Sequence, residues 1–509
     1  MRRTGSSAVL GVLAAAAGVA VGELLAAATR PPAGPLVAVG GAIIDATPTP
    51  VKEFAVRELG TADKPVLLGS IGVVLVVFAA VVGLLTARRW WFGIVGAGIL
   101  GVAGAGAALS RPAAGIYDAV PSLLAAAVAG VLLVGAARRV PAVAASPAAS
   151  ALGKPSRVLV DRRAFLQAAA VIAGGTVAAG GAAAVVKRAR GGAVTASRAA
   201  IKLPAAADPA KPLPTGVGPG FVTPNAGFYR VDTALTVPRI DVDSWRLRVH
   251  GMVGREQTLS FADLLDRPLI ERVITLNCVS NEVGGPYIGT ARWLGVPLAP
   301  LLREVGIDPG ADQLVARSAE GMTIGTPTAT VLDGRDAMLC VGMNGEPLPL
   351  EHGFPVRMLT PGLFGYAGAC KWVTELELTT FAEFDAYWVR RGWAAQAPVK
   401  TASRIDRPQP FAEVPAGDAT IAGVAWAQGR GIRTVEVRVD DGSWQRADLL
   451  PTPSTDTWVQ WRLPWKPAAG PHTLTVRATD DTGAVQPEAR VTPFPSGATG
   501  WHGITVTVT

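Results

Sequence analysis

One cysteine lies where its sulfur could reach a ligand. Cys278 closes the apolar run 273–277 and is followed by the polar, glycine-containing turn 279–285. A thiolate placed at such a strand end can bind a soft, redox-active metal. An isolated cysteine is also commonly a small buried hydrophobe, so Cys278 alone does not decide between the two. One cysteine cannot hold zinc or an iron–sulfur cluster, so a metal here needs most of its ligands from elsewhere, such as an organic cofactor.

A second candidate region is dense in glycine and proline. Residues 342–357 read Gly-Met-Asn-Gly-Glu-Pro-Leu-Pro-Leu-Glu-His-Gly-Phe-Pro-Val-Arg, and 361–372 end in Ala-Cys-Lys-Trp. Such a composition fixes backbone amides at close approach, while His352, Arg357 and Lys371 offer donors to a phosphate or a pterin. A buried turn with a solvated arginine and lysine is an equally good interpretation of the composition alone.

The elements around these residues predict two domains. From about 221 to 395 short apolar runs alternate with Gly/Pro turns, and 260–265 and 297–304 are typical of short helices, the first capped by Ser260. This part is expected to be an α+β domain. Over 396–509 the strand patterns continue without helical periods, with a clear hairpin at 434–448. The second part is therefore predicted to be a β-sandwich.

Residues 1–190 hold nearly all of the long uncharged stretches. Candidate spans lie at about 8–28, 66–86, 91–109, 119–137 and 164–186, each close to the roughly 20 residues that cross a bilayer core. Helices buried in a soluble domain are a poor alternative, because these stretches have no polar face. We expect a bundle of about five transmembrane helices, followed by a linker over 191–220.

Basic residues in the short loops orient the spans. They are Arg2, Arg3, Arg88, Arg89, Arg138, Arg139, Lys154, Arg157, Arg162 and Arg163. Placing all of them in the cytoplasm alternates consistently through five crossings, so the loop 29–65 and everything after 187 face outward. The chain is predicted to be a multi-pass cell-membrane protein with extracytoplasmic catalytic domains. Residues 160–167 also resemble a twin-arginine export signal. A plain basic flank would explain the arginine pair alone, and Phe165 and Leu166 after it favour the export signal.

Composition limits the partners. Half of the 509 residues are hydrophobic and 17% are charged, which excludes disorder and is too apolar for an ordinary soluble enzyme. The net charge of +8 is better explained by basic flanks of apolar runs than by binding to nucleic acid, so no nucleic-acid partner is expected. None of the four histidines lies in an apolar run, so a haem held by two helical histidines is excluded. Electrons then need a separate redox partner: a cytochrome subunit, a quinone or a soluble carrier.

Together, these motifs resemble the sulfite oxidase family of molybdopterin enzymes. The resemblance rests on Cys278 with Asn281, on 291–298, and on the blocks 343–357 and 361–372, and it covers about 221–509. It implies a sulfite-oxidase-like molybdopterin domain and an immunoglobulin-like sandwich of the kind called a dimerisation domain, hence a possible homodimer. It also implies the cofactor Mo-molybdopterin, with the thiolate of Cys278 as the protein's ligand to molybdenum.

The resemblance also assigns residues to the cofactor and to catalysis. The cofactor-binding candidates are Tyr229, Arg230, Asn281, Ser318, His352, Arg357, Ala369, Cys370 and Lys371. Besides Cys278, the catalytic candidate is Arg430, in place of an arginine that the family's sandwich sends into the pocket, although its spacing differs by one. For Cys340 and Cys370, a disulfide and two buried thiols both stay open.

Departures from the family pattern bear on the substrate. Sulfite oxidases follow their ligand cysteine with a motif containing arginines, whereas 281–284 here read Asn-Glu-Val-Gly. A carboxylate beside the metal would repel a dianion such as sulfite. The family's active-site tyrosine also lacks a clear counterpart within 321–325. We therefore expect oxygen-atom transfer, with reduction of an S-oxide or N-oxide favoured. Sulfite oxidation, or a non-catalytic membrane protein with a partner-binding sandwich, is the alternative.

Overall fold

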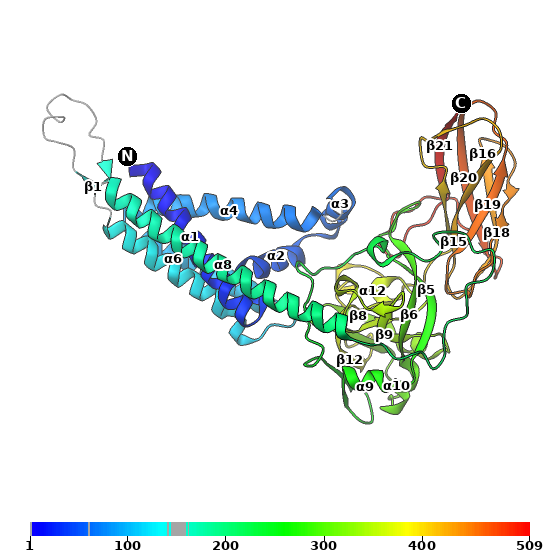
Figure 1. Ribbon diagram of the computed structural model, residues 1–509, viewed down its shortest axis with the longest axis horizontal. Helices are drawn as coiled ribbons and strands as arrows, with labels where there is room; N and C mark the ends of the chain where they lie inside the picture. The colour runs from blue at the N-terminus through cyan, green and yellow to red at the C-terminus, as the bar shows by residue number, and fades with distance from the viewer. Residues whose placement is uncertain (1–2, 60–61, 140–141, 144–158, 161) are drawn as a thin grey trace. The chain divides into compact units, whose positions relative to one another are not determined.

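The computed structural model describes residues 3–59, 62–139, 142–143, 159–160 and 162–509 (Figure 1). The chain forms two compact units. The first comprises Met1–Thr195 with Thr233–Val237, and the second comprises Ala196–Asp232 with Pro238–Thr509. Each unit is described by itself below.

The first unit is helical. Its helices are α1 (Arg3–Ala28), α2 (Pro35–Ala46), α3 (Thr49–Leu59), α4 (Asp63–Thr86), α5 (Trp91–Leu109), α6 (Val120–Arg139) and α8 (Arg162–Ala200). Within the described residues, five helices are long and apolar enough to cross a membrane: α1, α4, α5, α6 with the turn before it, and α8. The sequence predicts the same number of spans.

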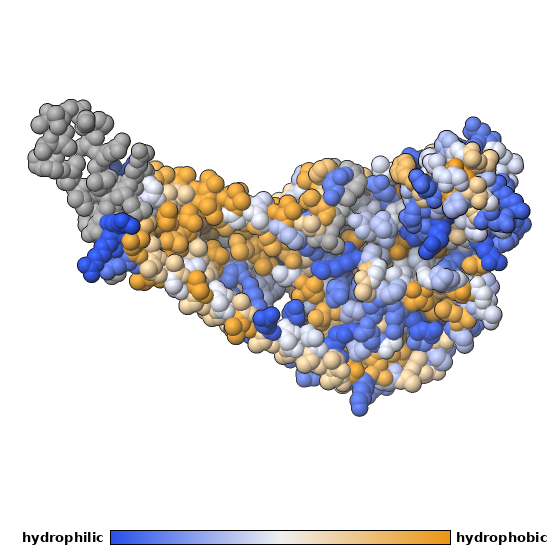
Figure 2. Space-filling view, turned by 45° about the horizontal axis from the view of Figure 1, so that its top comes forward, coloured by the Kyte–Doolittle hydropathy of each residue, from blue (hydrophilic) through white to orange (hydrophobic). Residues whose placement is uncertain are grey.

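Small residues let these helices approach closely. A Cβ added at Gly11 of α1 would lie 2.2 Å from the carbonyl oxygen of Ala79 in α4, and one at Gly18 would lie 2.2 Å from that of Ala125 in α6. Such backbone contact is typical of helices that pack in lipid. The larger side chains point outward instead: Val73, Val74, Val77, Val102 and Val131 are all exposed. Figure 2 shows hydrophobic residues gathered over the surface of this unit, at the left of the view.

Two segments differ from the sequence prediction. The loop predicted over 29–65 contains α2, which begins with Pro35 at its first turn, and α3; proline there supplies a backbone angle suited to a helix start. Helix α8 continues to Ala200, past the predicted span end at 186 and into the predicted linker. Residues 187–200 are rich in alanine and arginine, which favour helix, and Pro204 follows the helix end.

The second unit begins with a mixed α+β domain of two sheets. One contains β5 (Ile270–Asn277), β6 (Ile288–Pro297), β9 (Met338–Met343), β10 (Glu346–Pro347) and β11 (Arg357–Leu359). The other contains β3 (Arg246–Gly251), β4 (Gln257–Ser260), β7 (Gln313–Ser318), β8 (Thr323–Pro327) and β12 (Val373–Thr379). Its short helices are α9 (Phe261–Leu265), α10 (Leu298–Glu304), α11 (Thr328–Leu332) and α12 (Gly365–Gly368). As predicted, Ser260 caps α9, since its hydroxyl accepts from the backbone N–H of Asp263 at 3.2 Å.

A β-sandwich follows, as the sequence predicts. One sheet has the order β13 (Ala402–Arg407), β15 (Ala419–Trp426), β19 (Val459–Trp465), β18 (Asp448–Leu449). The other has the order β14 (Glu413–Val414), β21 (His502–Val508), β20 (Gly470–Asp480), β16 (Ile432–Val439), β17 (Gln445–Arg446). Alternating inward residues of both sheets, among them Ile421, Trp461, Val435 and Val476, form its core.

The sandwich completes the outer edge of strand β5. The backbone N–H of Thr275 donates to the carbonyl of Asp456 at 3.0 Å, and its carbonyl accepts from Nε2 of Gln428 at 3.2 Å. Its hydroxyl accepts from the backbone N–H of Trp458 at 2.8 Å. An edge strand otherwise leaves such groups unpaired. The strand that leads to Cys278 is therefore fixed from both sides.

Candidate active site

Cys278 follows the last residue of β5 and lies in a closed loop. Its backbone N–H donates to the carbonyl of Tyr287 at 2.9 Å, and its carbonyl accepts from the N–H of Asn281 at 3.0 Å. The side-chain oxygen of the buried Asn281 accepts from the N–H of Tyr287 at 2.8 Å. Farther along, Arg404 of the sandwich donates to the carbonyl of Gly285 at 2.7 Å. Main-chain hydrogen bonds thus determine where the sulfur lies, and the side chain of Asn281 stabilises the loop that carries it.

The environment of Cys278 keeps it protonated in this structure. Burial raises the pKa of its thiol, while hydrogen bonds from Ser280 and the positive charge of Lys371 act in the opposite direction. A coordinated metal ion removes such a proton, because it stabilises the thiolate far more than these neighbours do. The site therefore suits a sulfur ligand and is poorly suited to a free thiolate nucleophile.

Tyr229 links this thiol to the basic side of the site. Burial and the neighbouring Cys278 raise the pKa of its phenol, and the charge of Arg357 opposes them. Its ring stacks on Phe228 with centroids 5.2 Å apart, and Phe228 lies edge-on to His352 at 5.5 Å. The structure therefore brings together predicted residues that lie more than 120 positions apart in the chain.

His352 is buried and neutral. Burial and the charge of Arg357 lower its pKa to about 4, and its Nε2 lies 3.1 Å from the backbone carbonyl of Asn225. A carbonyl can only accept, so the proton resides on Nε2 and Nδ1 is left as an acceptor. With Nε2 engaged by Asn225, the ring nitrogen left for a cofactor is an acceptor, and the assignment of His352 to a phosphate or a pterin stays a prediction.

Arg357 has the properties of an anion ligand. Its side chain is buried, with one weak bond from NH1 to the carbonyl of His352 at 3.4 Å, and its Nε has no partner among the described residues. The guanidinium lies over the ring of Trp293 at 5.3 Å. Gly353, at φ +114°, lets the chain pass here, because an added Cβ would lie 3.2 Å from the side chains of Arg357 and Lys371. A buried cation with spare donors calls for a negatively charged partner.

Lys371 and Arg230 share one carboxylate. The ammonium of Lys371 lies 2.6 Å from the buried carboxylate of Asp232, which also accepts from Nε of Arg230 at 3.0 Å. Burial lowers the pKa of Lys371 to about 8, and Asp232 opposes that shift. Lys371 also donates to the carbonyl of Glu351 at 3.2 Å. The two cations are thereby positioned beside the 352–357 segment.

Three other predicted residues carry no charge and stabilise the local backbone of the site. Ser318 ends β7, and its hydroxyl accepts from the N–H of Met322 at 3.1 Å. Ala369 closes α12 through its N–H to the carbonyl of Gly365 at 3.0 Å. Cys370 is buried, and burial raises its pKa to about 12. All three cysteines of the chain are free, so Cys340 and Cys370 form no disulfide here.

Arg430 does not join this group. Its Nε donates to Asp480 at 3.0 Å, and its NH2 donates to the carbonyl of Val399 at 3.0 Å and to the hydroxyl of Thr401 at 3.2 Å. These bonds commit the guanidinium to the sandwich and the segment leading into it. They do not test the catalytic role of Arg430, which stays a prediction.

Sequence reasoning missed two contributors. Asn225 supplies the carbonyl that accepts from His352, and its side-chain oxygen accepts from Nδ2 of Asn344 at 2.8 Å. Arg198, in the last turn of α8, donates to the carbonyl of Leu348 at 2.7 Å. Asn225 stands in a Pro-Asn-Ala-Gly turn, which indicates a loop and says nothing of its partner.

Comparison with known proteins agrees with this geometry. Residues 234–388 match the model of the oxidoreductase molybdopterin binding domain, and 393–509 match that of the Mo-co oxidoreductase dimerisation domain. Sulfite oxidase of Gallus gallus is 31% identical over 335 residues, 55% of this chain and 72% of that protein. The chain therefore belongs to the sulfite oxidase family of molybdopterin oxidoreductases.

Other relatives are matched over less of their length. Mitochondrial sulfite oxidase of Mus musculus is 31% identical over 354 residues, which is 59% of this chain and 64% of that protein. Among solved structures, sulfane dehydrogenase SoxCD from Paracoccus pantotrophus is 26% identical, with a TM-score of 0.48, over 53% of this chain and 75% of that one. The chain thus spans less than two thirds of the mouse enzyme.

Family membership implies the cofactor Mo-molybdopterin, and the residues present fit it. The unpartnered Nε of the buried Arg357 offers a donor to an anionic group, and the neighbouring Lys371 adds a second cation. Nδ1 of His352 can accept from a pterin N–H, and Cys278 offers a sulfur ligand. When bound, this cofactor supplies two-electron redox chemistry and an exchangeable oxygen, which no side chain here can supply.

Proposed function

We propose that this chain is a membrane-anchored molybdenum oxidoreductase that transfers an oxygen atom on the extracytoplasmic face. The observation that carries the proposal is that one thiol, Cys278, and one buried guanidinium, Arg357, both lie near enough to Tyr229 to shift the pKa of its phenol. Cys278 is assigned to the metal. Arg357 and Lys371 are assigned to the anionic part of the cofactor, and His352 to its pterin.

Reduction of an S-oxide or N-oxide is the favoured reaction. Glu282 is exposed four residues after Cys278, in the loop that the sandwich holds at Gly285. A carboxylate at this place disfavours a dianionic substrate and tolerates a neutral oxide. The reaction would consume two electrons and two protons and release the reduced substrate and water. Electrons would come from a separate carrier, since the chain has no haem or iron–sulfur motif.

Sulfite oxidation is the second candidate, favoured by 31% identity to sulfite oxidases. Two assays of the purified full chain distinguish oxide reduction from sulfite oxidation. One supplies a reduced viologen dye and assorted oxides, and the other supplies sulfite and an artificial electron acceptor. Glu282→Arg sharpens the test, because an added cation should raise activity toward sulfite. Full-length protein that contains no molybdenum, purified from molybdenum-replete cells, would instead support a non-catalytic membrane protein.

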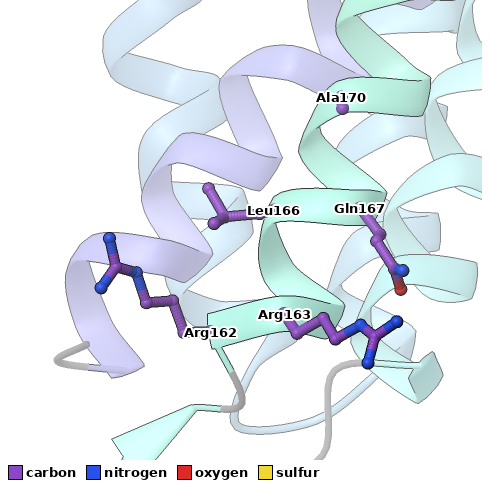
Figure 3. A pocket seen from close by; sticks show the side chains of 5 residues that line it. All are labelled: Arg162, Arg163, Leu166, Gln167 and Ala170. Atoms are coloured by element: carbon purple, nitrogen blue, oxygen red, sulfur yellow. The ribbon is translucent and has the colours of Figure 1, made fainter.

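The membrane anchor is proposed from the first unit. Five long apolar helices with exposed valine side chains are suited to a lipid environment. Figure 3 shows Arg162 and Arg163 extending in opposite directions from the first turn of α8, at the end proposed to face the cytoplasm. Of the basic residues that orient the spans, Arg2, Lys154 and Arg157 lie outside the described residues. Phe165 is buried in the same hydrophobic cluster as Leu10, and the export-signal interpretation stays a prediction.

Orientation can be tested by thiol labelling. Phe411→Cys in the sandwich and Trp90→Cys between α4 and α5 place a thiol at exposed positions. A membrane-impermeant maleimide added to intact protoplasts should label the first variant and spare the second. Labelling of the second variant alone would reverse the proposed topology. A homodimer through the sandwich is proposed from the dimerisation-domain match, and light scattering in detergent tests it.

A further inference from the structure

The last turn of helix α8 lies against the block that leads to His352. Nε of Arg198 donates to the carbonyl of Leu348 at 2.7 Å, and its NH2 donates to Oε2 of Glu346 at 2.9 Å and to the carbonyl of Pro347. These acceptors belong to three consecutive residues, and Arg198 is itself largely buried, at 20% side-chain exposure. One guanidinium therefore fixes the whole 346–348 segment through charge-assisted bonds.

Glu346, held by Arg198, in turn accepts a hydrogen bond from Asn225. Its Oε1 accepts from Nδ2 of Asn225 at 2.5 Å, while Oε2 is held by Arg198. Asn225 is further held by Asn344, whose Nδ2 donates to its side-chain oxygen at 2.8 Å. The carbonyl of the same Asn225 accepts from Nε2 of His352 at 3.1 Å. A continuous series of hydrogen bonds thus joins Arg198 to His352.

We propose that Arg198 is a positioning residue of the cofactor site, acting on His352 through Glu346 and Asn225. The inference rests on the proposed function in that His352 is taken to face the pterin. It assigns to α8 a role besides anchoring, because the final turn of that helix becomes part of the support of the site. Pattern reasoning places Arg198 in a linker, where no such role is expected.

The chemistry of His352 explains what would be lost. Its tautomer is fixed only while the carbonyl of Asn225 stays within reach of Nε2. Without Arg198, the half-exposed carboxylate of Glu346 loses its cation, and the 346–348 segment loses three bonds. Asn225 then shifts, and His352 no longer presents Nδ1 in one orientation. The pterin side should weaken, while the bonds that hold the Cys278 loop come from Tyr287 and from the sandwich and should persist.

The test uses the full chain in detergent, loaded with cofactor and then diluted. The pterin still bound at each time is released by denaturation and oxidised, and its fluorescence is measured. Arg198→Ala should lose pterin about three- to tenfold faster than wild type, the factor expected when a net hydrogen-bond contribution of about 1 kcal/mol is removed. Arg198→Lys should lose pterin at an intermediate rate, since lysine keeps the positive charge but cannot make the several parallel hydrogen bonds of a guanidinium. The Mo(V) resonance spectrum of the cofactor still bound should match wild type. Arg248→Ala, which removes an exposed ion pair with Glu256 in the same unit, should change neither quantity.

Several outcomes would contradict the inference. Wild-type pterin retention in both Arg198→Ala and Glu346→Gln would overturn it, as would an altered Mo(V) spectrum with unaltered retention. Should Arg198→Ala unfold below room temperature, the Arg198→Lys and Glu346→Gln variants decide in its place. Wild-type protein that holds no pterin overturns the proposed function itself, and this result is distinguishable because it does not depend on any variant.

Discussion

The two sides of the candidate site are built differently. On the thiol side, Cys278 is placed by main-chain bonds, to Tyr287 within the domain and through Thr275 and Gly285 to the sandwich. On the basic side, Arg357 and Lys371 stand on a segment dense in glycine and proline, and their charges are balanced by few neighbours. Main-chain hydrogen bonds determine the position of the Cys278 sulfur, whereas the positive charges of Arg357 and Lys371 make the basic side suited to an anion. Changes on the first side should therefore alter chemistry, and changes on the second should alter cofactor retention.

The largest effect is expected on the thiol side. Cys278→Ser should abolish turnover while leaving the chain folded, because a serine oxygen is a harder and more basic donor to the metal. The serine hydroxyl has Ser280 within reach as a partner, and even an unpartnered buried hydroxyl costs about 1–3 kcal/mol, which a domain of this size tolerates. Oxide-dependent dye oxidation and molybdenum content should be measured side by side. Cys340→Ala, at a buried thiol in β9, is the matched control and should stay active. Near-wild-type turnover in Cys278→Ser would remove this residue from the metal.

The next effect lies on the basic side. Arg357→Met keeps an unbranched apolar stem and removes the charged guanidinium, so pterin content should fall about tenfold or more, in line with the loss of a charged hydrogen bond of about 1.5–3 kcal/mol. Turnover per bound molybdenum should change little. Arg248→Met, which removes an exposed ion pair with Glu256, is the control. Equal loss of pterin in both variants would mean that Arg357 has no special part in retention.

A pH dependence should follow from Lys371. Its pKa of about 8 means that the free site holds an ammonium below that pH and a neutral amine above it. An anionic group prefers the charged form, so cofactor affinity should be full below pH 8 and fall by up to about tenfold per unit above it, until the raised pKa of the bound state is reached. Pterin retention measured from pH 7 to 10 tests this. Lys371→Arg should flatten the profile, and a wild-type profile that is already flat would refute it.

The smallest effect should come from the sandwich contact. Gln428→Ala removes the donor to the carbonyl of Thr275, three residues before Cys278, and should lower the free energy of unfolding by about 1 kcal/mol. If the sandwich positions the sulfur, the Mo(V) spectrum should shift while pterin retention stays at the wild-type rate. Chemical denaturation and spectroscopy measure the two. A change in retention with an unaltered spectrum would break the distinction between the two sides.

Local patterns predicted much of this molecule. Apolar runs without a polar face predict the long helices, alternation predicts the sandwich, and the Ser260 cap is visible as Ser-Phe-Ala-Asp. Helix α3 was missed because its composition is mixed, and the end of α8 because alanine and glycine also suit a linker.

The candidate site divides in the same way. Cys278, Arg357 and Lys371 lie in motifs that can be read from neighbouring residues. The contacts of Asn225 and Arg198 join residues more than 120 positions apart, so no local pattern reveals them. The bond of Arg430 to Asp480 also joins residues far apart in the chain, and the catalytic role of Arg430 stays a prediction.

The completed edge of β5 has a consequence for biosynthesis. Its partners Gln428 and Trp458 are made 153 and 183 residues after Thr275. At about 5–20 residues per second, the strand waits roughly 10 to 35 s for them. Throughout that interval a nascent chain presents an open β-edge beside its ligand cysteine, which is a template for wrong pairing. Ribosome pausing or truncation before residue 458 should therefore yield aggregated chains, with the loss traceable to an unfinished partner domain.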